Sequence, residues 1–174
     1  MCEDITISNI SMRNLIYGPL LFRLGARLRG PKDSTGVGAL RRILVPNIVS
    51  YNSDASIGNI LSGIPGHPIE DIKIANFYIQ HKGGISPEQG KIVPPEGVDK
   101  YPDPGVFGPM PAHGFFLRHL RHLEMSHVEI APMAMDGRPA FVLEMWSVRT
   151  FSRLPPQLHR LRSRYVMPEI FASV

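Results

Sequence analysis

The sequence predicts an all-β chain that coils into stacked, similar turns of parallel strands. The first observation is that apolar and polar residues alternate in four short segments, as they do along a strand with one buried face. The second is that each segment places Asn, or His in the last case, directly before another apolar residue. The four segments are 3–10, 42–48, 70–77 and 122–128. Each is typical of a strand, a tight corner and a second strand.

Three apolar series are expected to lie one above another in consecutive turns. Side chains alternate across a strand, so every member of a series can point inward. The series are Ile5, Ile43, Ile72 and Leu123, then Ile7, Val45, Ile74 and Met125, and then Ile10, Ile48, Phe77 and Val128. Their recurrence predicts the register between neighbouring turns.

Asparagine occupies the expected corner in three of the four segments, as Asn9, Asn47 and Asn76. Asn tolerates a left-handed backbone better than most residues. Stacked Asn amides can also hydrogen-bond to one another along the axis of such a coil. His127 stands in the fourth corner and fits the pattern less well.

A further apolar run follows each repeat and is expected to give each turn a third strand. These runs are 19–24, 57–64, 113–118 and 138–143. Two insertions interrupt the pattern, at 25–40 and 82–112. A structureless loop as long as the second is unusual inside a compact domain, and such loops are more often functional or disordered.

An antiparallel sandwich of similar strands is the alternative fold. Antiparallel hairpins favour short turns of the Asn-Gly or Asp-Gly kind. Asp136-Gly137 is the single good candidate for such a turn in the sequence.

Composition and charge limit the kinds of partner that we expect this chain to bind. A chain of 174 residues suits one domain, and 17 Pro and 16 Gly indicate many turns. The single Cys2 excludes an internal disulfide, and no apolar run is long enough to span a membrane. The net charge of +4 resides in residues 145–174, while 1–144 are neutral. No recognised nucleic-acid motif accompanies the basic tail, so we expect neither a nucleic-acid nor a membrane partner.

Residues from about Cys2 to Glu144 resemble the C-terminal part of a bacterial glycoside hydrolase family 28 protein, one of the polygalacturonase-like enzymes that degrade pectin. The runs that carry the likeness are Asp-Ile-Thr-Ile-Ser-Asn-Ile at 4–10, Phe-Arg-Leu-Gly-Ala-Arg at 22–27, Ser-Gly-Ile-Pro-Gly-His-Pro at 62–68 and His-Gly-Phe-Phe-Leu-Arg at 113–118. The resemblance implies a partial right-handed parallel β-helix of the pectin-lyase type with about four turns. It also implies inverting hydrolysis of galacturonic-acid polymers by a secreted or periplasmic parent enzyme that needs no cofactor.

The family's catalytic motifs do not occur in this sequence. Inverting hydrolysis needs one carboxylic acid to protonate the leaving oxygen and one carboxylate to activate water. The family supplies these groups from Asn-Thr-Asp and Asp-Asp motifs, with Gly-His-Gly and Arg-x-Lys nearby, and none of the four is present. The chain is therefore expected to be a fragment whose catalytic turns would precede Met1. An open first turn also predicts self-association through sheet edges.

Arg27, Arg29 and His67 are the candidate substrate-binding residues. Arg forms bidentate contacts with carboxylates, which suits an acidic sugar polymer. The alternative is that these are ordinary loop residues. Tyr101 and Phe107 of the long insertion can either stack on sugars or pack on the coil, and we favour packing. We expect no metal site from the cluster of His119, His122 and His127, because a continuous strand would place His122 on the opposite face.

The tail, residues 145–174, is expected to be irregular, and a frameshift is one hypothesis for it. Met and Trp have single codons, so Met145-Trp146-Ser147 can begin ATG TGG TC. With one G in front, the same bases encode Asp-Val-Val, which continues a β-helix turn. The alternative is a genuine tail with a short amphipathic helix around 158–166.

Three functions remain open at this point. The first is a fragment of a pectin-directed hydrolase that is inactive, or nearly so, alone. The second is a non-catalytic carbohydrate-binding β-helix. The third is a structural or interaction solenoid whose basic tail meets a partner.

Overall fold

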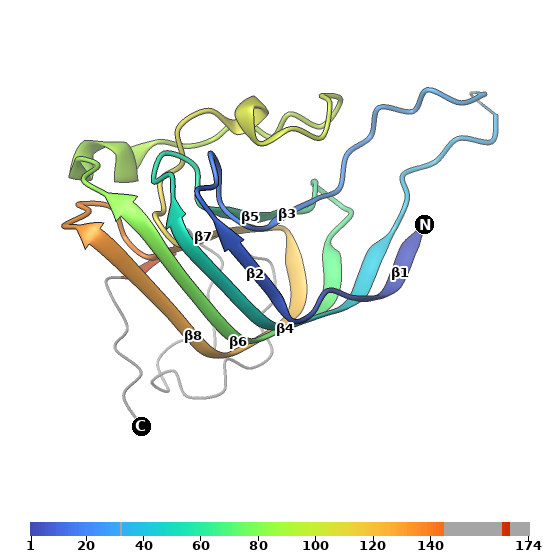
Figure 1. Cartoon of the computed structure of the whole chain (residues 1–174). Coiled ribbons are helices and arrows are strands. Elements are labelled where there is room, and N and C mark those ends of the chain that lie inside the picture. The colour runs from blue at the N-terminus through green and yellow to red at the C-terminus, as the bar shows by residue number, and fades with distance from the viewer. Residues whose placement is uncertain (32, 145–164, 168–174) are drawn as a thin grey trace.

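The computed structural model describes residues 1–31, 33–144 and 165–167, and these residues form a mostly β structure (Figure 1). The strands are β1 (Cys2–Thr6), β2 (Ile10–Arg13), β3 (Leu21–Arg23), β4 (Leu40–Ser53), β5 (Asn59–Ser62), β6 (Ile69–Gly83), β7 (Phe115–Arg118), β8 (Leu120–Ala134), β9 (Phe141–Glu144) and β10 (Tyr165–Met167). Two short 3₁₀ helices, η1 (Pro87–Lys91) and η2 (Pro104–Phe107), are the helical elements of the described part. No helix in the described part of the chain is long and apolar enough to cross a membrane.

The strands form two five-stranded sheets, and the chain alternates between them. Sheet A has the order β1-β4-β6-β8, with β2 also paired to β4, and sheet B has the order β10-β9-β7-β5-β3. Figure 1 shows β2, β4, β6 and β8 side by side in chain order. Every pairing is parallel apart from that of β10 with β9. The antiparallel sandwich is therefore wrong for the described strands.

The register is the one that the repeats predict. Ile5, Ile43, Ile72 and Leu123 lie opposite one another in successive strands of sheet A. The same holds for Ile10, Ile48, Phe77 and Val128, and for Val45, Ile74 and Met125. The inner members of these rows form the core between the two sheets, together with Leu61, Phe115, Leu117 and Leu143 of sheet B.

The long strands of sheet A bend where the corner asparagines were predicted. Asn9, Asn47 and Asn76 have φ angles of 58°, 61° and 53°, and His127 has 51°. The Asn47 amide donates to Asn9 Oδ1 at 2.9 Å, and the Asn76 amide donates to Asn47 Oδ1 at 3.0 Å. The amide ladder predicted for the three corner asparagines is thus confirmed at all three positions.

Two further corner rows were not predicted. Asn14 and Asn52 also have positive φ, and the Asn52 amide donates to Asn14 Oδ1 at 2.8 Å. The other row is formed by Asp4, Arg42, Asp71 and His122, each with φ between 54° and 59°. Asp accounts for half of this row because its short polar side chain tolerates the left-handed region.

Three residues of the tail are described. Tyr165–Met167 form β10, which pairs antiparallel with β9 at the end of sheet B. The irregular structure expected for the tail therefore does not extend to these three residues. The frameshift hypothesis and most of the alternative helix fall on residues outside the described part and stay predictions.

Candidate functional site

The outer face of sheet B is the face on which the long insertion lies. Alternate residues of its strands point inward to the core or outward to the insertion. The outward positions form two rows, which the register aligns. One row is apolar, with Leu21, Ile60, Phe116 and Val142, and the next is polar, with Arg23, Ser62, Arg118 and Glu144.

The apolar row is covered by the insertion between β6 and β7. Phe107 and Met110 pack on Ile60, Phe116 and Val142 in a second hydrophobic cluster. Phe107 is only 2% exposed, which confirms the prediction that this aromatic packs on the coil. Tyr101, by contrast, is 64% exposed, so the same prediction is wrong for Tyr101.

The polar row anchors the backbone of the insertion. Arg23 donates to the carbonyl oxygens of Gly97 and Tyr101, and its guanidinium lies 5.1 Å from the centre of the Phe107 ring. Arg118, whose side chain is 2% exposed, donates to Pro94 O at 2.9 Å and to Pro95 O at 3.3 Å. Charged donors on carbonyls make strong hydrogen bonds, so the insertion is fastened to the sheet rather than free above it.

Two carboxylates meet at Arg118. Its Nε donates to Glu144 Oε2 at 2.7 Å, and its Nη1 lies 3.7 Å from Glu96 Oε2. Glu96 Oε1 also lies 3.0 Å from His119 Nε2. An inverting glycosidase needs space for a water and a sugar between its two carboxyl groups. Here a buried guanidinium binds both, so Glu96 and Glu144 form an ion-paired clamp and not a catalytic pair.

The predicted binding residues lie at separate places around this face. Arg27 is half-buried, with its guanidinium 4.9 Å from the centre of the Tyr101 ring, which ties the shorter insertion to the long one. Arg29 is exposed further along the same insertion.

His67 is exposed in the turn between β5 and β6, where its N–H donates to Ile64 O at 2.9 Å. Gly66 in that turn has a φ of 78°, which explains the Pro-Gly pair before His67.

Of the three clustered histidines, His119 directly precedes β8, and His122 and His127 lie within it. His119, His122 and His127 all have positive φ, so the alternation assumed in the sequence analysis breaks at each of them. His119 contacts Glu96, whereas His122 Nδ1 lies 2.9 Å from Asp71 Oδ1. Among the described residues, no group of three His, Cys, Asp or Glu side chains could hold a metal ion.

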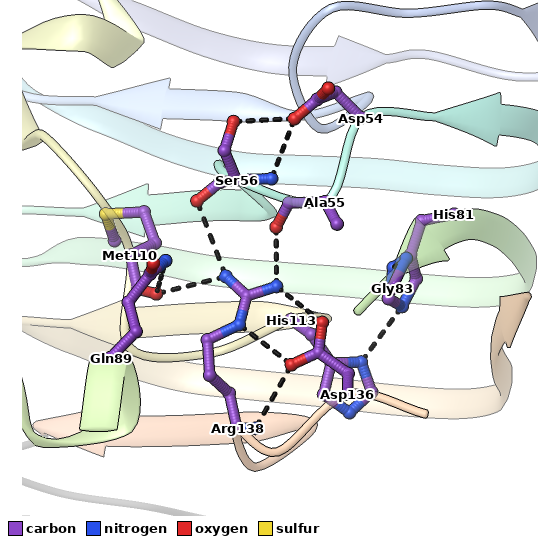
Figure 2. A network of polar contacts seen from close by, with 10 residues as sticks. All are labelled: Asp54, Ala55, Ser56, His81, Gly83, Gln89, Met110, His113, Asp136 and Arg138. Atoms are coloured by element: carbon purple, nitrogen blue, oxygen red, sulfur yellow. Dashed lines mark hydrogen bonds and ion pairs between the residues drawn. The ribbon is translucent and has the colours of Figure 1, made fainter. Parts of the chain in front are cut away.

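A second buried polar cluster was missed by the sequence analysis (Figure 2). Asp136 and Arg138 form an ion pair at 2.8 Å with both side chains fully buried. Arg138 also donates to the carbonyl oxygens of Ala55 at 2.5 Å and Met110 at 3.1 Å. One arginine therefore joins the β4–β5 connection, the end of the long insertion and the β8–β9 connection.

Two buried histidines lie beside this ion pair (Figure 2). His81 Nε2 is 3.0 Å from His113 Nδ1, and the Gly83 N–H donates to His81 Nδ1 at 3.2 Å. Burial lowers the pKa of His113 to about 4 and also lowers the pKa of His81. Burial acts to raise the pKa of Asp136, but the hydrogen bonds and charge of Arg138 outweigh it and keep that pKa below its ordinary value. The alternation of the strand places His81 on the inward face, two residues after Ile79, and this position in the sequence could have indicated that His81 is buried.

Comparison with protein-family models, with curated proteins and with solved structures found no match to this chain.

Proposed function

We propose that this chain is part of a glycoside hydrolase of the polygalacturonase-like type, directed at pectic polysaccharide, and that it folds as a partial right-handed parallel β-helix. The parent enzyme is proposed to be secreted or periplasmic. The observation that carries the fold is the asparagine ladder at the corners of a chain that alternates between two parallel sheets.

The proposed right-handedness of the coil rests on a general preference of connections between parallel strands. A connection between two parallel strands of one sheet is right-handed in about 98% of cases, because right-twisted strands favour that path. Such connections join each of the four circuits, from β1–β3 to β8–β9, to the next one within both sheets. A right-handed coil of four turns is therefore the topology that these pairings favour.

The proposal of a pectic substrate rests on the resemblance at residues 22–27 and 62–68, and two structural details agree with it. These residues lie at the ends of β3 and β5 and in the segments that follow them, with Arg27 against Tyr101 and His67 exposed in its turn. Arg29 lies two residues after Arg27 and is exposed to solvent, whereas Arg23 is bound to the backbone of the long insertion. Arginine beside an exposed aromatic ring suits a polymer with both carboxylates and apolar sugar faces.

Catalysis is not expected from the described part of the chain. The outer face of sheet B is covered by Phe107 and Met110, and its carboxylates Glu96 and Glu144 are held by Arg118. The chain would therefore contribute scaffold and polymer contacts, while the reacting carboxylates would come from elsewhere in the parent enzyme.

Affinity electrophoresis in gels containing sodium polygalacturonate tests polymer binding. We expect retardation that is reduced several-fold by Arg29→Ala, since one carboxylate contact is removed. The matched control is Lys73→Ala, which removes one positive charge from the outer face of sheet A. Gels containing dextran, a neutral polymer, should retard neither protein.

The outcomes separate the candidate functions. Release of reducing ends from polygalacturonate by the purified chain would contradict the absence of catalytic carboxylates. Retardation without hydrolysis fits both the hydrolase fragment and the carbohydrate-binding module. Sequencing of the source locus then decides, since upstream in-frame coding with paired-Asp motifs favours the fragment. Absence of retardation would favour a structural or interaction solenoid.

A further inference from the structure

Tyr101 is an aromatic side chain that the long insertion presents to solvent. It is 64% exposed, whereas Phe107, the other aromatic residue of this insertion, is buried against sheet B. Packing on the coil therefore accounts for Phe107 and leaves most of the Tyr101 side chain open to a ligand.

The backbone at Tyr101 is fixed by contacts with other segments. Arg23 of β3 donates to the carbonyl oxygen of Tyr101. The Asp103 N–H donates to the same oxygen at 2.8 Å. In the shorter insertion, the Ala26 N–H donates to Val98 O at 2.7 Å, which joins the two insertions. An exposed ring on a fixed backbone has little conformational freedom left to lose when a ligand binds.

The ring itself is contacted by the shorter insertion. The Arg27 guanidinium lies 4.9 Å from the centre of the Tyr101 ring, which is a cation–π distance. Leu28, the next residue, has a φ of 41° and is 49% exposed. A bulky residue in the left-handed region is unusual, and backbone strain of this kind is concentrated at functional sites. Tyr101, Arg27 and Leu28 are called here the Tyr101 platform.

The two arginines that contact Tyr101 are already engaged. Arg23 donates to the carbonyl oxygens of Gly97 and Tyr101. Arg27 is half-buried, with its guanidinium against the ring. A site for a sugar carboxylate needs an arginine whose donors are open to the ligand. Neither arginine presents its whole guanidinium in this way.

The exposed charges next to Tyr101 in the sequence are mostly negative. Asp99 and Asp103 lie two residues away on either side, and Lys100 is the one cation between them. A carboxylate placed on the ring would therefore meet an excess of like charge, which disfavours its binding. An uncharged sugar avoids this repulsion and still buries its apolar face on the aromatic ring.

We propose that the Tyr101 platform binds a galacturonate residue whose carboxyl group is methyl-esterified. This inference rests on the proposed pectic substrate and refines it. The uncharged sugar stacks on the ring, and its ester adds apolar surface where a free carboxylate would meet Asp99 and Asp103. Arg29, exposed two residues beyond Arg27, binds a free carboxylate elsewhere on the same polymer. The preferred substrate is a partly esterified galacturonan and not the fully ionised polymer.

Affinity electrophoresis with two forms of one pectin tests this preference. One gel contains a highly methyl-esterified pectin, and the other contains the same pectin after mild alkaline removal of its esters. Mobility in each is compared with a gel that lacks pectin. We expect several-fold stronger retardation in the esterified gel. Retardation in the de-esterified gel should be weaker but measurable, because Arg29 still binds carboxylates there.

Variants of Tyr101 show whether the ring is responsible. Tyr101→Ala should remove the preference, so that both gels retard the chain equally. Tyr101→Phe keeps the ring and should retain the preference. The matched control is Val93→Ala, which truncates another exposed apolar side chain of the same insertion. Circular dichroism confirms that each variant is folded.

The variant Asp99→Asn/Asp103→Asn tests the contribution of charge. It should increase retardation in the de-esterified gel several-fold and so narrow the preference. Asn at position 103 keeps an oxygen that can accept from the Gly105 N–H, as Asp103 Oδ1 does at 2.7 Å. The control Glu88→Gln/Glu129→Gln removes two exposed acids elsewhere on the chain and should leave the preference unchanged.

The outcomes distinguish this inference from the proposed function. Equal or stronger retardation of the unmodified chain in the de-esterified gel would overturn the inference and leave a pectic substrate in place. A preference that survives Tyr101→Ala would also overturn it, because the ring would not be the binding element. Absence of retardation in both gels would contradict the inference and the proposed function together.

Discussion

The Nε2 atom of His81 lies 3.0 Å from the Nδ1 atom of His113, with both rings almost fully buried. The Gly83 N–H donates to His81 Nδ1, so the Nε2 of His81 must carry its proton and donate to His113. Protonation of His113 at Nδ1 would place two donors against each other. The pair is thus stable in its neutral form.

This pair predicts a loss of stability in acid. The folded pKa of His113, about 4, lies below its ordinary value of 6.5, so its contribution is complete above pH 6.5. That contribution is lost as the pH falls from 6.5 to about 4, which amounts to roughly 3 kcal/mol. Urea unfolding at a series of pH values measures it. The double variant His81→Leu/His113→Phe should flatten this part of the profile, whereas His67→Gln should leave it unchanged.

Breaking the Asp136–Arg138 pair should be strongly destabilising. Asp136→Ala leaves a fully buried guanidinium without its carboxylate, which costs about 3–5 kcal/mol. The double variant Asp136→Ala/Arg138→Met removes both charges and should be less destabilised than the sum of the single changes. Chemical denaturation of all three variants completes the cycle. Additive free energies of unfolding would show that the two side chains are not coupled.

Arg118 should control the order of the long insertion. Arg118→Met removes the donors to Pro94 and Pro95 and the ion pair with Glu144. We expect faster hydrogen exchange and faster proteolysis within residues 84–112, with sheet A protected as before. Arg121→Met, on the exposed face, is the control. Equal exchange in the two variants would mean that the apolar cluster at Phe107 alone fastens the insertion.

Asn47 should be sensitive to backbone conformation. Asn47→Ala loses both ladder hydrogen bonds and keeps a Cβ at a φ of 61° without the polar side chain that makes this φ tolerable, a conformation that costs an L-residue about 1–2 kcal/mol. Asn47→Gly loses the same hydrogen bonds but adopts this φ freely. The glycine variant should therefore be the more stable of the two in thermal unfolding. The reverse order would show that the left-handed corner is not the main constraint.

Much of the coil could be predicted from the sequence because its register depends on local alternation. Ile5, Ile43 and Ile72 occupy the same place in the alternating pattern of their segments, so equivalent positions align wherever the turns stack. The clamp at Arg118 and the pair Asp136–Arg138 could not be predicted in this way, since their partners come from insertions with no period. The histidine corners were misjudged for a related reason: a left-handed residue breaks the alternation on which the facing rule depends, and His is a less common choice there than Asn.

The asparagine ladder has a consequence for how the chain folds. Its hydrogen bonds join residues 38 and 29 positions apart, so even adjacent rungs form only after a long loop has closed. Parallel pairing of this kind makes folding slow, because the entropy of closure is lost before the contacts form. Within sheet A, the shortest closure joins β4 to β6, and these strands also pair along most of their length. We therefore expect sheet A to begin forming at this pair and to spread outward, one turn at a time, toward both of its ends.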